Sequence, residues 1–388
     1  MNAKVTYING IFLLGAMVGC KQQFLPPTTA ANANILVVDG FINVSDSTIV
    51  NLSRTVIVAN KSVANPETKA TLTIENAQGI VATLTETVKG SYVTPKLTLD
   101  NTKQYRLRIK TSNGKTYVSD LTDVRISPPI DSIGYKATST GLQIYLNTHD
   151  ATNKSRYYKY NYRETWAFST FFGSGFTGNG VCCTIVGRTP AQMVNKCFGS
   201  DSSANITLNS TIQLSQDVVY QKPITTIDTT SEKIETRYSI LVSQQVLTKD
   251  AYDFWTLLQK NTEQLGSIFD AQPSQTIGNI HNVNDASEPV IGYISVGTIQ
   301  KKRIFIDKTA LPARWHATYP YQCTLDSAYY VHPGIFPPRN DIAAQLLYLV
   351  GTYAITPFTD YGGGWQFATA QCADCTIRGD KQQPSYWK

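Results

Sequence analysis

Six of the seven cysteines of this 388-residue chain lie beyond residue 180, at positions 182, 183, 197, 323, 372 and 375. An even number of cysteines in an oxidising compartment indicates disulfides, here up to three. Cys372 and Cys375 form a CxxC, which also occurs in zinc and redox sites, but there is no second CxxC and no preceding βαβ pattern. We predict that Cys183 pairs with Cys197 and Cys323 with Cys375. Cys182 and Cys372 have no assigned partner.

Residues Gly173–Gly178 satisfy the GxGxxG pattern of dinucleotide sites. Such a site needs the loop between a strand and a helix, and Val181-Cys182-Cys183 follows instead. We therefore interpret the segment as a loop stapled by a disulfide. Its aromatic residues either contact a partner or fold back onto their own domain, and they are Phe171, Phe172 and Phe176.

A second aromatic group alternates with basic residues between positions 156 and 166. It contains Tyr157, Tyr158, Tyr160, Tyr162 and Trp166, interleaved with Arg156, Lys159 and Arg163. One hypothesis is a stacking surface for sugars or single strands, on which Tyr158, Tyr160 and Trp166 contact a partner. The other is an amphipathic strand with an aromatic core face and a charged outer face.

The sequence contains no recognisable catalytic or metal-binding motif. Its histidines, at positions 149, 281, 316 and 332, are dispersed, and no HExxH, GxSxG, P-loop or calcium-loop pattern occurs. The net charge of +6 is scattered and does not indicate nucleic acid binding. We predict a non-enzymatic protein without a cofactor or metal. A glycan or peptide hydrolase stays open as an alternative, because a carboxylate pair can hide among 28 acids.

The N-terminus predicts export and lipid anchoring. Lys4 precedes a short apolar stretch, Ile11–Val18, that fits a signal peptide and is too short to span a bilayer. The following Gly19-Cys20 resembles a lipobox, in which the cysteine is diacylated and the chain is cut before it. We therefore predict a signal peptide over residues 1–19, lipidation at Cys20 and a tether over residues 20–34.

The remaining chain predicts a mainly β protein with two domains. Residues 35–127 read as short strands with period-two alternation, which indicates an immunoglobulin-like or carboxypeptidase-regulatory-like β-sandwich. Ser127-Pro128-Pro129 marks the boundary to a larger β-rich domain over residues 128–388 with disulfide-stapled loops. Its expected strands are Leu142–Asn147, Tyr157–Trp166, Ile206–Leu214, Arg237–Leu247, Val290–Val296 and Lys301–Asp307.

One or two helices are expected in the larger domain. Thr248 can cap a helix that carries Ala251, Phe254, Trp255 and Leu258 on one apolar face and ends at Gly266. Asn340–Val350 is a second candidate, and Asp270–Ser287 reads as an ordered loop.

Several short phrases occur together in a recognisable order. They include Val38-Asp39-Gly40-Phe41-Ile42, Pro129-Ile130-Asp131-Ser132-Ile133, Ala251-Tyr252-Asp253-Phe254-Trp255, Asp374-Cys375-Thr376-Ile377-Arg378-Gly379 and Pro384-Ser385-Tyr386-Trp387. The set resembles the Bacteroidota lipoprotein family called domain of unknown function 4249. The resemblance implies an accessory lipoprotein of a TonB-dependent, SusC-like outer-membrane barrel, with a fold unlike that of SusD-type lids. The family brings no established catalytic residues.

The resemblance and the predicted anchor together predict a binding or docking subunit at the outer membrane. Its partners are expected to be the barrel, the membrane through the lipid, and a glycan or peptide cargo, with no nucleic acid. An adhesive or structural surface lipoprotein is the alternative. Cell-surface display is expected over the periplasmic face, although Lys21-Gln22-Gln23 lacks the acidic residues that often follow the lipidated cysteine in exported relatives.

Overall fold

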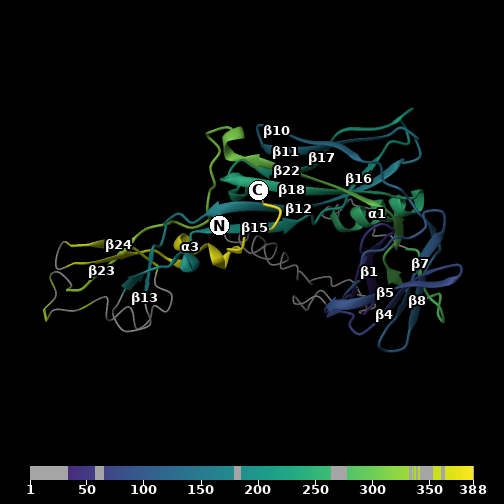
Figure 1. Ribbon diagram of the computed structural model, residues 1–388, viewed down its shortest axis with the longest axis horizontal. Coiled ribbons are helices and arrows are strands. Elements are labelled where there is room, and N and C mark those ends of the chain that lie inside the picture. The colour runs from purple at the N-terminus through teal and green to yellow at the C-terminus, as the bar shows by residue number, and fades with distance from the viewer. Residues whose placement is uncertain are drawn as a thin grey trace, which may run out of the picture.

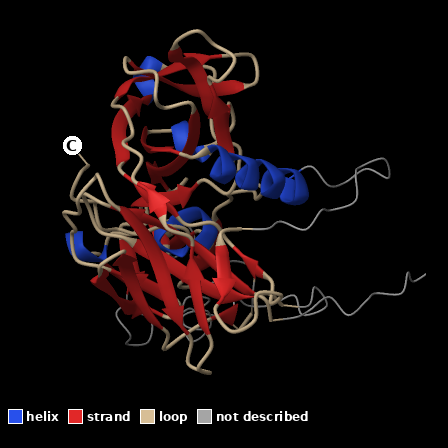
Figure 2. Cartoon of the chain, turned by 90° about the vertical axis from the view of Figure 1, so that its right-hand side faces the viewer, coloured by secondary structure: helices blue, strands red, loops and turns tan. Residues whose placement is uncertain are grey.

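The computed structural model describes residues 34–56, 65–178, 185–263, 278–331, 334, 336–337, 340, 353–359 and 363–387. The chain is mainly β, as predicted, and its strands form several separate sheets. Figure 1 shows the sheets following one another along an elongated molecule, and Figure 2 shows how little of it is helical. Within the described ranges, no helix combines the length and hydropathy that a membrane crossing requires.

The first sheet is built mainly from the N-terminal part of the chain and encloses one core. The buried side chains of this core come from strands throughout the sheet, among them Leu36, Leu52, Leu72 and Ile109. The sequence alternation in Tyr105, Leu107 and Ile109 is confirmed, because these three side chains are buried. The main strands are β1 (Leu36–Asn43), β2 (Ile49–Arg54), β4 (Thr71–Asn76), β5 (Gly79–Val88), β6 (Ser91–Val93), β7 (Gln104–Lys110) and β8 (Thr116–Ser119). The shorter strands β3 (Asn65–Pro66) and β9 (Thr122–Asp123) pair with β2 and β7.

A distant segment of the chain returns to complete this sheet. Strand β19 (Ile280–Asn282) pairs with β8, while β20 (Val290–Ile291) and β21 (Ser295–Gly297) run parallel to β1. The sequence placed this stretch in the second domain and treated part of it as a loop, so both assignments need correction. These strands are only two or three residues long, so they show no periodicity of their own. Their place in the fold is set by pairing with strands that lie far away in the sequence.

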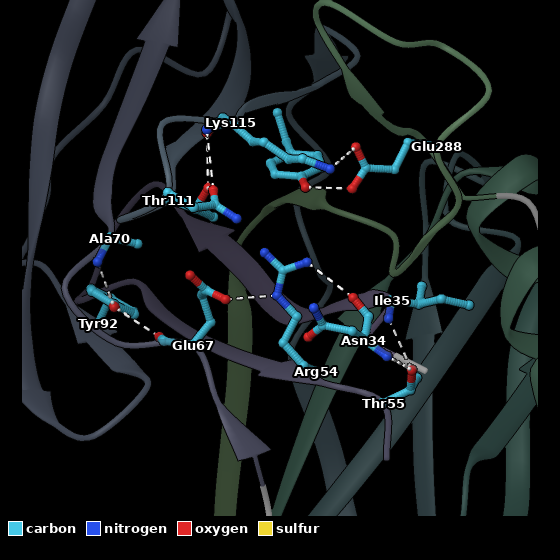
Figure 3. A network of polar contacts seen from close by, with 12 residues as sticks. Asn34, Ile35, Arg54, Thr55, Glu67, Ala70, Tyr92, Thr111, Lys115 and Glu288 are labelled. Atoms are coloured by element: carbon cyan, nitrogen blue, oxygen red, sulfur yellow. Dashed lines mark hydrogen bonds and ion pairs between the residues drawn. The ribbon is translucent and has the colours of Figure 1, made fainter. Parts of the chain in front are cut away.

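Buried polar contacts hold the returning segment and the first strands in place (Figure 3). The Tyr117 hydroxyl donates to Glu288 at 2.8 Å, and Lys115 forms an ion pair with the same carboxylate at 2.9 Å. On β2, Arg54 donates to Glu67 at 2.6 Å and to the backbone oxygen of Asn34 at 3.1 Å. Tyr117 and Arg54 are buried, so the loss of their partners would leave polar groups unsatisfied away from water, whereas Lys115 is about half exposed.

The second unit consists of two sheets that pack across one core. Residues from both sheets form a single buried cluster, including Ile144, Tyr160, Ile227 and Ile240. The smaller sheet contains β10 (Ile130–Ala137), β11 (Gly141–Asp150) and β17 (Asp217–Asp228). The larger sheet contains β15 (Lys196–Ser202), β12 (Tyr157–Ser169), β18 (Arg237–Val246), β22 (Ile299–Asp307) and β16 (Thr207–Ser210).

Helix α1 (Lys249–Glu263) follows β18 and lies where the first sheet meets the second unit (Figures 1 and 2). The predicted cap is confirmed, since the Thr248 hydroxyl accepts a hydrogen bond from the Ala251 backbone at 3.2 Å. Of the four residues predicted on its apolar face, Ala251 and Phe254 are buried, and Trp255 and Leu258 are half-buried. The predicted end at Gly266 lies outside the described residues, and so does all of the second predicted helix, Asn340–Val350, except Asn340.

A small third sheet lies at the far end of the molecule from the first sheet (Figure 1). It has its own cluster around Ala354, Trp365 and Phe367, which the sequence did not separate from the larger domain. Its strands are β13 (Phe176–Gly178), β14 (Ile185–Gly187), β23 (Asp326–Tyr329), β24 (Ala354–Phe358) and β25 (Gly364–Phe367).

The C-terminal segment fastens the third sheet to the second unit. Short helix α3 (Ala370–Ala373) carries Cys372, which is bonded to Cys323, and Cys375 is bonded to Cys197 on β15. The predicted pairs Cys183–Cys197 and Cys323–Cys375 are therefore wrong, and Cys182 and Cys183 lie outside the described residues. Sequence proximity misled the prediction, because Phe198 bridges to Asp380 and brings Cys375 beside Cys197.

Candidate functional site: a polar cleft between the first sheet and the second unit

A polar cleft of about 270 Å³ opens between the first sheet and the second unit. The first sheet contributes the outward face of β1, β2 and β21, and the second unit contributes the outward face of β12, β18 and β22, with α1 beside them. The side chains that matter for its chemistry are Asp39, Lys159, Asn161, Arg163, Trp255, Tyr293, Ser295 and Lys301.

Strand alternation places Lys159 in this cleft. Tyr158 and Tyr160 point into the core of the second unit and are fully buried, so Lys159 between them points to the opposite face. Its neighbour across the sheet is Gln245, and Asn161 occupies the next position on the same face. The cleft face of β12 is therefore lined by the side chains of Lys159, Asn161 and Arg163.

Lys159 is a buried cation without a hydrogen-bond acceptor. Its side chain is 9% exposed, and its Nζ lies 3.1 Å from the ring centroid of Trp255 on α1. It forms no hydrogen bond or ion pair with any residue of the described ranges. Burial lowers the pKa of Lys159 to about 8, although the nearby carboxylate of Asp39 partly opposes this shift. In the protein without a ligand, the ammonium form of Lys159 is therefore disfavoured by about 3 kcal/mol relative to a lysine in water.

The polar groups around Lys159 are also largely unsatisfied. The Ser295 hydroxyl is buried without a hydrogen-bond partner in the described part of the chain. Across the described segments, the side chains of Asp39, Asn161 and Arg163 likewise form no hydrogen bond. Other lining residues do have partners: Lys301 at the rim faces Asp46 at 3.7 Å, Asn43 accepts a hydrogen bond from the Ser45 backbone, and Tyr293 is hydrogen-bonded with Thr248. Of the cleft groups that lack a hydrogen bond, Lys159 and Ser295 are buried, and buried polar groups are normally paired. Asp39 and Arg163 are exposed to solvent, so the two buried groups are the ones that a ligand could satisfy.

A larger cleft of about 570 Å³ lies along the linker Ser127-Pro128-Pro129, but its polar groups are mostly occupied. His149 contacts Asp131 at 2.8 Å, and this hydrogen bond raises the pKa of His149. Asp150 accepts hydrogen bonds from Thr152 and from the backbone of Ser155. The linker cleft is therefore braced by hydrogen bonds among its own residues.

The aromatic residues that the sequence singled out lie outside the polar cleft. Tyr158 and Tyr160 are fully buried, so the hypothesis that they contact a partner is wrong and the core alternative holds. Trp166 is half-buried and donates from its indole nitrogen to Glu232 at 3.3 Å. These rings face inward because the core requires large apolar side chains at every second position of β12.

The three loop phenylalanines have different environments. Phe176 packs against Trp365 with ring centroids 4.8 Å apart, so it folds back onto its own sheet. Phe171 is 66% exposed, and its ring contacts Phe172 edge-on. Phe171 thus keeps the surface position that a partner contact needs. The GxGxxG segment enters β13, which pairs with β14 as a hairpin and has no dinucleotide-site geometry.

Sequence reasoning missed the cleft residues, although one signal was present. Lys159 sits on a strand between two core tyrosines, and the alternation already assigned it to the outer face. The sequence of β12 does not reveal that this face is covered. The covering residues Tyr293 and Ser295 belong to the returning segment, which reaches this face because it pairs with β1. In the described residues, no group of three histidine, cysteine or acidic side chains is positioned to hold a metal ion.

Comparisons with known proteins place the chain in a family without assigning an activity. No curated protein matches it. One solved structure, titled "Biofilm associated protein - BSP domain", is 12% identical over 50% of this chain and 30% of its own, with a TM-score of 0.18. A second covers 57% of this chain and 91% of its own at 10% identity and a TM-score of 0.14. Its title names the manganese lipoxygenase of Gaeumannomyces graminis and part of the zonadhesin of Komagataella pastoris.

Both likenesses are too distant to inform the site, and the chain spans less than a third of the biofilm-associated structure. The family comparison is decisive. A profile described as "Domain of unknown function (DUF4249)" matches residues 21–303, which include every residue that lines the cleft. The chain therefore belongs to the DUF4249 family.

Proposed function

We propose that this protein is a non-enzymatic, lipid-anchored binding subunit of the outer membrane that holds a small polar ligand in the cleft around Lys159. The observation that carries the proposal is the buried ammonium of Lys159, which faces the cleft without an acceptor. A protein retains such a costly group where a ligand supplies the missing partner. The lipid at Cys20 and the tether behind it would hold the cleft at the membrane surface.

The partner in this proposal is a TonB-dependent barrel. The resemblance of the sequence to transporter-associated lipoproteins supports this choice, and a shared membrane plane raises the effective concentration of the two proteins. The exposed Phe171, a few residues before β13 of the third sheet, is suited to such a contact. An adhesive lipoprotein is the second candidate, favoured by the small third sheet that projects from the rest of the molecule (Figure 1).

The proposed anchor and partner predict the result of a pull-down. Tagged protein extracted from its native membrane in mild detergent is expected to bring a TonB-dependent barrel in near-equal amount. The variant Cys20→Ser is expected to lose membrane attachment and the barrel together, because it cannot be acylated. Mass spectrometry of the recovered proteins and of the N-terminal peptide measures both effects.

The matched control is Phe171→Ala, which leaves the anchor intact. It is expected to remain in the membrane and to recover less of the barrel. Recovery of the acylated wild type without any barrel would reject the transporter role and favour the adhesive candidate. An unacylated Cys20 in the native membrane would reject the anchor.

A further inference from the structure

We infer that the cleft binds a small hydroxylated carboxylate, such as a sugar acid, with the carboxylate of the ligand on Lys159 and its hydroxyls near Asp39 and Asn161. This inference rests on the proposed binding function and names the ligand class of the same cleft. It follows from the charges, the free polar atoms and the shape of the lining.

The charges of the cleft select an anion. Lys159 lies inside, while Arg163 on β12 and Lys301 on β22 lie at the exposed rim of the same face, with β18 between their strands. Among the described residues that line the cleft, Asp39 is the one with an acidic side chain. A cation would meet three like charges on entry, whereas an anion would be attracted toward the one buried ammonium.

The arrangement favours a carboxylate over a phosphate. Phosphate sites generally combine several backbone N–H groups or a guanidinium fork around a doubly charged group. Here the buried cation is a single lysine, and the guanidinium of Arg163 is exposed at the rim. One ammonium matches one negative charge. The Ser295 hydroxyl, buried and unpaired, can donate a further hydrogen bond.

The remaining lining groups select hydroxyls on the ligand. The Asp39 carboxylate accepts hydrogen bonds, and the amides of Asn161 and Gln245 both donate and accept. Trp255, which already has Lys159 Nζ against one ring face, and Tyr293 add aromatic surface to the lining, against which the C–H groups of a sugar ring can pack. At about 270 Å³, the cleft has the size for one small polar molecule and not for a polymer.

Calorimetric titration of the purified full-length protein in detergent tests the inference. The probes are D-glucuronate, L-lactate and D-glucose, the last being the neutral match of the first. D-glucuronate is expected to bind at least about tenfold more tightly than D-glucose, because only the acid pairs with the ammonium. Binding of L-lactate as well would show that a short hydroxy acid suffices, and its absence would show that the sugar ring is needed.

Variants assign the binding to the cleft. Lys159→Met is expected to weaken D-glucuronate binding at least about tenfold while the protein stays folded, since the lost ammonium has no hydrogen bond to break. Lys136→Met, which removes an exposed lysine of β10, is the control and is expected to bind as the wild type does. Equal affinities of Lys159→Met and wild type would overturn the inference.

A further variant separates the two possible failures. If D-glucose binds as tightly as D-glucuronate and Trp255→Ala weakens both, the carboxylate assignment is rejected while the binding function of the cleft stands. If none of the three probes binds, the inferred ligand class is rejected. The pull-down uses none of the three probes, so it tests the proposed transporter role even if the inferred ligand class is rejected.

Discussion

Alanine at both Cys197 and Cys375 is expected to lower the free energy of unfolding by about 5 kcal/mol. The disulfide closes a separation of 178 residues, and a long closed loop removes much conformational entropy from the unfolded chain. It also fastens the C-terminal segment to the edge strand β15, where Trp387 packs against Phe198 with ring centroids 5.0 Å apart. Denaturant unfolding under non-reducing conditions measures the change.

The second disulfide provides the comparison. Alanine at Cys323 and Cys372 opens a shorter separation of 49 residues and is expected to cost about 4 kcal/mol. That change is expected to loosen the third sheet, because Cys323 precedes β23 and Cys372 follows β25. A Cys197→Ala, Cys375→Ala variant with the unfolding midpoint of the wild type would contradict the assigned pairing.

Glu288→Ala is expected to destabilise the protein by about 2 to 4 kcal/mol and to loosen the returning segment. The substitution removes the ion pair of Lys115 (Figure 3) and the acceptor of the fully buried Tyr117 hydroxyl, and it also frees the Asn282 amide. A buried donor left without a partner carries its full desolvation cost. Thermal unfolding and amide exchange of residues 280–297 measure the two effects.

The pH dependence of this contribution has a defined sign. Burial alone would raise the pKa of Glu288, but hydrogen bonds from Lys115, Tyr117 and Asn282 outweigh it and leave the pKa below its usual value. The stabilisation is therefore fully present above the ordinary carboxyl pKa and is lost as the pH falls through the lowered value. Glu288→Gln, which keeps an acceptor for Tyr117, is the matched control. Equal stabilities of the alanine and glutamine variants would contradict the account.

The sequence predicts most of the long elements because their side chains repeat with a clear period. Strands β7, β12 and β18 and the cap of α1 were identified in this way. The alternation on β12 even separates the buried Tyr158 and Tyr160 from Lys159 on the other face. Where one face of a strand must be buried, the pattern determines the register and needs no further information.

Features that depend on contacts between distant segments were not predictable in this way. Strands β20 and β21 pair with β1 across some 250 residues, and nothing local marks them as part of the first sheet. The pairing of Cys197 with Cys375 likewise depends on where the C-terminal segment docks. The cleft combines both problems, since Lys159 and Ser295 become neighbours only after the returning segment has joined the sheet.

Proton uptake on ligand binding tests the central claim, that the Lys159 cleft is the binding site, most directly. The titratable groups that line the cleft with Lys159 are Asp39 on β1, Arg163 on β12, Tyr293 before β21 and Lys301 on β22. Of these five groups, Lys159 has a pKa of about 8, so about half of its side chains carry the proton at pH 8. A bound carboxylate favours the ammonium and draws a proton from the buffer.

The measurement is a calorimetric titration with D-glucuronate at pH 8 in two buffers of different ionisation heat. The wild type is expected to take up about half a proton for each ligand bound. Lys159→Arg is expected to take up none, because a guanidinium stays charged at this pH. Binding to the wild type with no proton uptake, or uptake that persists in Lys159→Arg, would contradict the assignment of Lys159 as the group that meets the ligand.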